Sequence, residues 1–138
     1  MGAFEILEHT ADVGLRAFGA TPEEVFETAA EALATIVGAW RPGAGREREA
    51  ITLEPTRDLD AALVDWLSEV LYLQDRRDAV VAGVEVTRAS AEGTHGIVSW
   101  GPRGDDVLQG TAVKAITYHQ LRVEQTDGGW VAEVFVDV

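Results

Sequence analysis

The chain has 138 residues, 24 of them acidic and 11 basic, which gives a formal net charge of −13 and a sequence pI near 4.4. The hydrophobic fraction of 46% predicts a folded chain, and we expect residues 1–138 to form one domain. The absence of cysteine excludes disulfides and thiolate-bound metals. The strong negative charge argues against direct, stable binding to nucleic acid, whose phosphates attract Lys and Arg.

The first residues lack the features of a secretory signal. No basic segment precedes an apolar one, and acidic residues stand at Glu5 and Glu8. No apolar run approaches the roughly 20 residues that span a bilayer. Together with the absence of cysteine, these features lead us to expect a cytoplasmic protein without a membrane partner.

The first predicted elements are two short strands, around residues 4–7 and over residues 13–19. A helix is then predicted from Thr21 to about Val37. Thr21 can act as the N-cap, a proline occupies the first helical position, and Glu24 completes a capping box. The apolar residues of this segment share one stripe, so the helix should cover one face of a sheet.

Residues 38–49 are predicted to be an exposed loop, because they are rich in proline, glycine and alternating Arg and Glu. The alternating residues 51–54 predict a short strand that ends at a proline. A second helix is predicted over residues 59–74, since its apolar residues recur at helical spacing through three turns. Acidic residues at its start and arginines at its end suit the helix dipole.

The second half of the chain is rich in β-branched residues and predicts four strands. These strands are expected at 80–86, 97–100, 113–123 and 130–138, and Asp127-Gly128-Gly129 is typical of a hairpin turn. The order of elements predicts an α+β fold in which two helices pack on a mostly antiparallel β-sheet.

Two carboxylates stand out because of their positions. Asp12 precedes the second predicted strand, and Asp137 is the penultimate residue, beside the terminal carboxylate of Val138. If the sheet brings them together, they form an all-oxygen site that suits a hard cation such as Ca²⁺ or Mg²⁺. The alternative is that Asp12 is a turn residue and Asp137 is solvated.

Basic residues supply a second candidate. Lys114 is the only lysine among eleven basic residues and lies within an apolar run, so its compact ammonium is a candidate functional group or a chance occurrence. The histidines, His9, His95 and His119, are too dispersed for a pair of metal ligands on one helix. We interpret His119 as a hydrogen-bonded strand residue rather than a ligand.

Four segments resemble, in order, the motifs of the archease family. They are residues 8–17 (EHTADVGLRA), 65–73 (DWLSEVLYL), 113–119 (VKAITYH) and 136–138 (VDV). The family carries a Gly-Glu step and a histidine within the stretch that corresponds to residues 101–112, and this chain has neither. The resemblance otherwise extends over essentially the whole sequence.

The resemblance implies a non-catalytic activator of an RtcB-type RNA ligase, which joins RNA ends in tRNA splicing and RNA repair. Such a protein promotes guanylylation of the ligase and its multiple turnover. A divalent cation, foremost Ca²⁺ and otherwise Mg²⁺ or Mn²⁺, would be held by Asp12, Asp137 and Val138. Lys114, His9 and Asp12 would act in ligase activation.

The partner implied is the ligase, whose cleft should be basic because it binds RNA and GTP. An acidic body would be steered to such a cleft. The sequence is also compatible with two other functions. One is a stand-alone metal-dependent phosphohydrolase or nuclease, and the other is a chaperone-like adaptor whose cation is purely structural.

Overall fold

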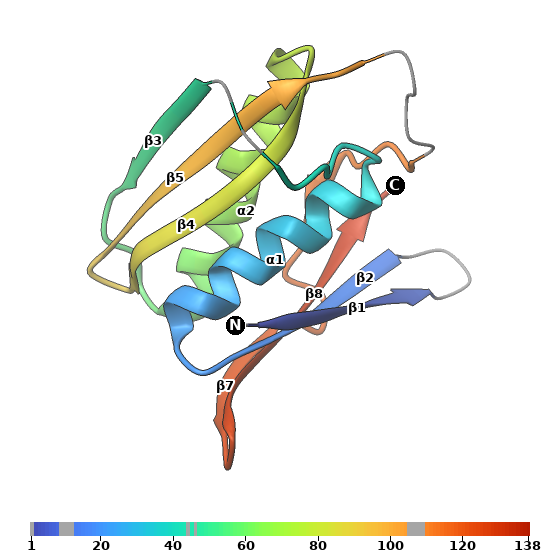
Figure 1. The fold of residues 1–138 in the computed structure, drawn as a ribbon. Helices are drawn as coiled ribbons and strands as arrows, with labels where there is room; N and C mark the ends of the chain where they lie inside the picture. Colours follow the sequence, from blue (N-terminus) through green and yellow to red (C-terminus); the bar gives the residue numbers. More distant parts are fainter. Residues whose placement is uncertain (1, 9–12, 44, 46, 105–109) are drawn as a thin grey trace.

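The computed structural model describes residues 2–8, 13–43, 45, 47–104 and 110–138. The described residues form an α+β fold of two helices and two antiparallel sheets (Figure 1). The expected class is therefore confirmed, with the strands divided between two sheets. No helix in the described part of the chain is long and apolar enough to cross a membrane.

The five-stranded sheet is centred on β8 (Gly129–Asp137). One edge of β8 pairs with β2 (Val13–Gly19), which pairs in turn with β1 (Ala3–Glu8). The other edge pairs with both β6 (Ala115–Ile116) and β7 (Arg122–Thr126). The C-terminal end of β8 therefore lies between segments from both halves of the sequence.

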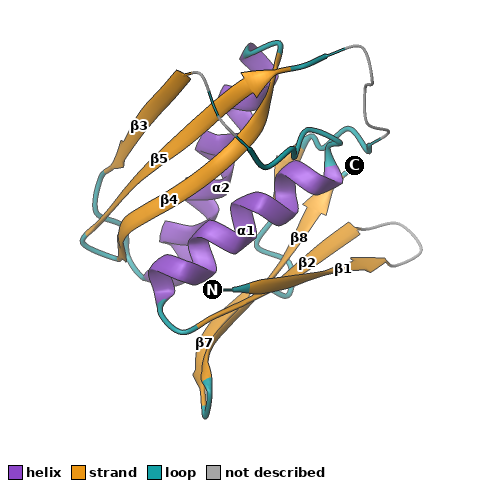
Figure 2. Ribbon diagram, viewed as in Figure 1, coloured by secondary structure: helices purple, strands orange, loops and turns teal. Residues whose placement is uncertain are grey.

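The three-stranded sheet has the order β3 (Glu47–Leu53), β5 (Gly93–Pro102) and β4 (Ala79–Ser90). The helix α1 (Pro22–Ile36) runs between the two sheets and packs mainly on β4 and β2, while α2 (Leu59–Arg76) packs behind it (Figures 1 and 2). The first helix begins at the predicted cap, and the second is capped in the same way by one of the acidic residues predicted at its start. Thr21 accepts a hydrogen bond from the backbone nitrogen of Glu24 at 3.2 Å, and Asp58 accepts one from Ala61 at 2.8 Å.

The outer edge of β4 is occupied by α1 and by the segment that follows it. Residues 39–41 hydrogen-bond with the backbone of Val81. Farther along β4, the backbone nitrogen of Val86 donates to Glu27 at 2.8 Å and that of Ala89 donates to Glu23 at 2.9 Å. Two glutamates of the helix thus replace the partners that a neighbouring strand would supply.

The hydrophobic core joins both sheets and both helices around Trp66. This side chain is fully buried, and its indole nitrogen donates a hydrogen bond of 3.0 Å to the carbonyl oxygen of Phe26 in α1. Its ring also lies directly over Gly96 of β5, at a distance that only glycine permits. Trp66 therefore fixes α2 against α1 and the three-stranded sheet.

The solvent-facing side of the five-stranded sheet carries a row of alternating charges. Arg16 pairs with Glu5 at 3.0 Å and with Glu133 at 3.4 Å, and Arg122 pairs with Glu133 at 3.0 Å. The four residues come from β1, β2, β8 and β7 and lie opposite one another in the strand register. Cross-strand pairs of opposite charge favour this register.

Several strand predictions are wrong in detail. The strands predicted at 80–86 and 97–100 are longer, Ala79–Ser90 and Gly93–Pro102. The predicted loop over 38–49 includes the first three residues of β3, which begins at Glu47 rather than at residue 51. Its charged residues are stabilised in the strand because Arg77 pairs with Glu47 at 2.9 Å and with Glu49 at 3.1 Å. Trp100 also donates a hydrogen bond to Glu49. These contacts come from distant parts of the chain, so the local pattern does not reveal them.

The single strand predicted over 113–123 is two short strands, β6 and β7, separated by residues 117–121. His119 is therefore an exposed residue between strands and not a strand residue. The second helix is two residues longer than predicted and ends at Arg76. The hairpin at Asp127-Gly128-Gly129 is confirmed, since it joins β7 to β8.

Candidate functional site at the end of β8

The C-terminal end of β8 brings together several of the predicted site residues. The backbone nitrogen of Lys114 donates a hydrogen bond of 2.8 Å to the carbonyl oxygen of Asp137. Ala115, the next residue, is the register partner of Asp137. On the opposite edge of β8, Val13 is the register partner of Val136. Lys114, Asp137 and Val138 thus belong to one small region of the surface.

Two predicted site residues, His9 and Asp12, lie outside the described residues. The residue that follows Asp12 in the sequence is Val13, and the residue that precedes Asp137 is Val136. These two neighbours are paired in the sheet.

The described site residues are open to solvent. Lys114 and Asp137 are exposed, and the side chain of Val138 is 42% exposed. Within the described part of the chain, Lys114 makes no ion pair. Such an open arrangement suits contact with a macromolecule better than enclosure of a small substrate.

The donor atoms at this end of the strand suit a hard cation. Asp137 offers a side-chain carboxylate, while its carbonyl oxygen already accepts a hydrogen bond from Lys114. Carboxylate oxygens are the ligands that Ca²⁺ and Mg²⁺ prefer. Among the described residues, no three or more His, Asp or Glu side chains gather into a metal site, so Asp137 and Val138 would need a further ligand.

Two residues that the sequence reasoning did not single out hold this region in place. The amide nitrogen and the hydroxyl of Thr117 both donate to the carbonyl oxygen of Phe135, at 3.1 and 2.9 Å. The ring of Phe135 covers Gly14, where an added Cβ would lie 2.8 Å from the ring. The signal for Thr117 was its position within the motif at 113–119, three residues after Lys114.

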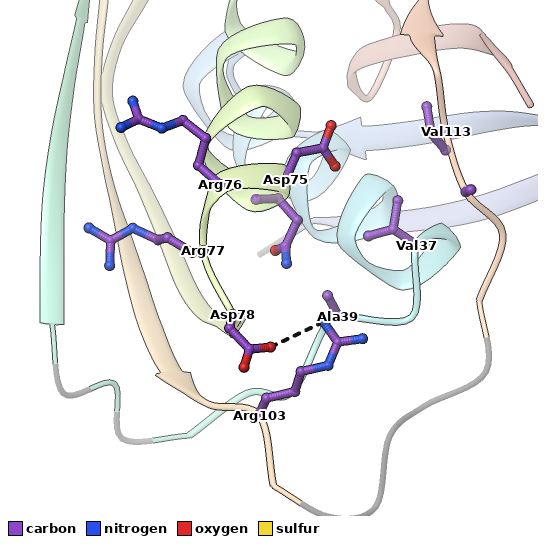
Figure 3. Close-up of a pocket in the computed structure, with 10 residues that line it drawn as sticks. Val37, Ala39, Asp75, Arg76, Arg77, Asp78, Arg103 and Val113 are labelled. Atoms are coloured by element: carbon purple, nitrogen blue, oxygen red, sulfur yellow. Dashed lines mark ion pairs between the residues drawn. The ribbon is translucent and has the colours of Figure 1, made fainter.

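A pocket of about 440 Å³ lies on the other side of the segment that leads to Lys114 (Figure 3). It is lined by residues that include Val37, Val113, Asp78 and Arg103, and the last two form an ion pair at 3.9 Å. Arg76 and Arg77 point away from Val113 in this view. None of the predicted site residues that the structure describes lines this pocket, so it is separate from the end of β8.

Comparison with known proteins supports one family over almost the whole chain. The model of the archease protein family matches residues 4–138. The chain is 40% identical to the protein archease of Methanosarcina mazei over 141 residues, which cover 98% of this chain and 95% of that protein. It is 34% identical to the protein archease of Pyrococcus furiosus, and the match covers both chains completely.

Solved structures agree with the fold. The solution structure of Methanobacterium thermoautotrophicum protein 1598 has a TM-score of 0.74 and 29% identity, covering 98% of each chain. The crystal structure of a Thermotoga maritima protein, described as an archease and possible chaperone, has a TM-score of 0.64 and covers 96% of this chain and 94% of that chain. Its identity is 22%, so it supports the fold alone.

Proposed function

The chain belongs to the archease family, and on that premise we propose that it activates an RtcB-type RNA ligase without catalysing ligation itself. It would promote guanylylation of the ligase and its multiple turnover in tRNA splicing and RNA repair, in the cytoplasm. The observation that carries this proposal is the meeting of Lys114 with Asp137 and Val138 at the end of β8.

The charge of the molecule supports docking on a basic partner. A ligase that binds RNA and GTP needs a basic cleft, and a body of net charge −13 is attracted to it over long range. The same charge disfavours direct binding to RNA. Stimulation of the ligase should therefore weaken as the salt concentration rises, because salt screens attraction between exposed charges.

The acidic residues and the lysine of the proposed site have different roles. Asp137, Val138 and Asp12 would hold a divalent cation, most simply Ca²⁺, with Mg²⁺ and Mn²⁺ as alternatives. When bound there, the cation supplies positive charge that can bind a phosphate oxygen. Lys114 binds an anionic group of the ligase or its nucleotide, and its backbone hydrogen bond to Asp137 fixes the two residues beside each other at the end of β8.

The experiment mixes the protein with a purified RtcB-type ligase and labelled GTP and measures guanylylated ligase over many turnovers. Lys114→Ala and Asp137→Asn should each lower the stimulation by about tenfold or more, equivalent to at least about 1.4 kcal/mol. The matched controls are Arg88→Ala on β4 and Asp127→Asn at the far end of the β8 hairpin, and both should stimulate like the wild type. Both control side chains are exposed.

Calorimetric titration with Ca²⁺ tests the cation separately. The wild type should bind the ion, and Asp12→Asn and Asp137→Asn should bind it at least about tenfold more weakly. Full stimulation by Lys114→Ala and Asp137→Asn would refute the proposed site. A nuclease or phosphatase activity of the protein alone would refute the non-catalytic role.

A further inference from the structure

Residues 117–121 project from the edge of the five-stranded sheet. Ile116 is the register partner of Val136, and Arg122 is the partner of Glu133. Only two residues of β8 lie between these partners, whereas five residues, 117–121, lie between Ile116 and Arg122. The surplus residues cannot continue the ladder and form a bulge, which we call the 117–121 bulge.

Hydrogen bonds give the 117–121 bulge a defined shape. Thr117 donates twice to the carbonyl oxygen of Phe135, and its hydroxyl accepts from the backbone nitrogen of His119 at 3.3 Å. The backbone nitrogen of Leu121 donates to the carbonyl oxygen of Tyr118 at 3.2 Å. Gln120 between them has a φ of 52°, the one positive φ outside glycine among the described residues. A left-handed conformation is unfavourable for a residue with a side chain, so the surrounding contacts must hold it.

The bulge presents an aromatic side chain to solvent. The side chain of Tyr118 is 50% exposed, and the guanidinium of Arg57 lies 5.2 Å from its ring centre. His119 is also exposed and contacts the ring of Phe135 edge-on, with 6.2 Å between ring centres. Tyr118 and Arg57 are of the residue types that dominate binding energy in protein interfaces.

Charge favours a protein rather than a nucleic acid as the occupant of this surface. Arg57 lies 3.6 Å from the carboxylate of Asp58, so its charge is already partly neutralised. Asp60 adds a second carboxylate near Arg57. The phosphates of an RNA strand would be repelled by the carboxylates of Asp58 and Asp60, and Arg57 alone does not outweigh these two negative charges. A half-exposed tyrosine with a polar surround matches the pattern of a protein contact.

We infer that the 117–121 bulge is a second contact surface for the ligase, with Tyr118 as its anchor; this inference rests on the proposed function. The bulge follows Lys114 by only three residues, and Thr117 is bonded to the same strand, β8, that ends in Asp137. Tyr118 thus follows Lys114 by four residues along the same edge of β8, where one partner can contact both. Because the bulge is already shaped, little conformational entropy is lost when it docks.

The chain offers a matched control for Tyr118. Tyr72 on α2 is 53% exposed, and the guanidinium of Arg76 lies 5.4 Å from its ring centre. The two tyrosines thus share exposure and an arginine neighbour, but Tyr72 is not on the bulge. Binding of the purified ligase to each variant can be measured by calorimetry, with circular dichroism to confirm that the variants are folded.

Tyr118→Ala should weaken ligase binding by about tenfold, whereas Tyr118→Phe and Tyr72→Ala should change it by less than about twofold. Thr117→Val removes the hydroxyl that shapes the bulge, and it should weaken binding and speed amide hydrogen exchange over residues 118–121. Equal effects of Tyr118→Ala and Tyr72→Ala, or none from either, would overturn the inference.

The outcomes separate this inference from the proposed function. If Lys114→Ala abolishes stimulation while Tyr118→Ala binds like the wild type, the inference fails and the activator role stands. If the wild type neither binds nor stimulates the ligase, both fail. The bulge would also be refuted as a protein contact if Tyr118→Ala no longer bound an RNA oligonucleotide that the wild type binds, while its binding to the ligase was unchanged.

Discussion

Replacing Gly96 by alanine should destabilise the protein by about 2 to 3 kcal/mol, because the new methyl group would meet the ring of Trp66. An ideal Cβ on Gly96 lies 2.5 Å from Cη2 and 2.8 Å from Cζ3 of that ring. The ring would have to move by about 0.9 Å to restore ordinary van der Waals contact. It is fully buried, so the surrounding core must move with it.

Three terms give the magnitude. Overpacking of a well-packed core costs about 1 to 3 kcal/mol. Movement of the ring also weakens the 3.0 Å hydrogen bond from Trp66 to Phe26, which adds about 1 kcal/mol. Alanine restricts the unfolded chain more than glycine does, and this offsets about 0.5 to 1 kcal/mol.

Urea unfolding followed by far-ultraviolet circular dichroism measures the change. The control is Gly83→Ala on the neighbouring strand, where the new Cβ would lie 3.8 Å from the Cβ of Ser99, and the effect should stay within about 0.5 kcal/mol. Trp66→Phe leaves room for the methyl group, so it should cost less in the Gly96→Ala protein than in the wild type. Equal costs of the two glycine variants, or strictly additive costs in the double variant, would refute the reasoning.

Two glutamates should show opposite dependences of stability on pH. Burial raises the pKa of Glu31, and the charge of Glu27 raises it further. The folded protein is therefore more stable with Glu31 protonated, and it loses this stability as the pH rises and the carboxyl ionises. Glu31→Gln should raise the melting temperature at about pH 7 and leave it unchanged below about pH 4. Burial opposes the shift at Glu133, but hydrogen bonds from Arg122 and Arg16 lower its pKa, so its stabilisation is lost as pH falls. Glu133→Gln should lower the melting temperature at about pH 7, and the loss should vanish as acid protonates the wild-type carboxyl. Thermal unfolding across this pH range checks both, and a shift of the same sign in the two variants at about pH 7 would contradict the assignments.

The helices were predictable because their signals are local. Thr21 and Asp58 cap the helices through bonds to residues three positions ahead, and the apolar spacing of each helix is visible in its own segment. The strands depend on distant partners. β3 begins at Glu47 because Arg77 and Trp100 contact its glutamates, and no pattern within residues 47–49 indicates this.

The candidate site was predictable only in part, because some of its residues stand out in the sequence and others matter only through distant partners. Lys114 and Asp137 stood out by composition and position, and the structure places their backbones in contact. Thr117 and Phe135 did not stand out, because their roles arise only when β6 pairs with β8. The break between β6 and β7 likewise follows from the spacing of partners along β8 and not from the residues of 113–123, which are suited to a strand throughout.

The contacts of Glu23 and Glu27 with β4 have a consequence for aggregation. A free strand edge offers unpaired backbone groups on which another chain can add a strand. On β4, the N–H groups of Val86 and Ala89 are taken by these carboxylates, and residues 39–41 cover the start of the strand. Among the described residues, β3 is the other edge of the three-stranded sheet, and Glu47 and Glu49 place charges along it. The α1 helix thus protects the protein from the self-association to which edge strands are prone.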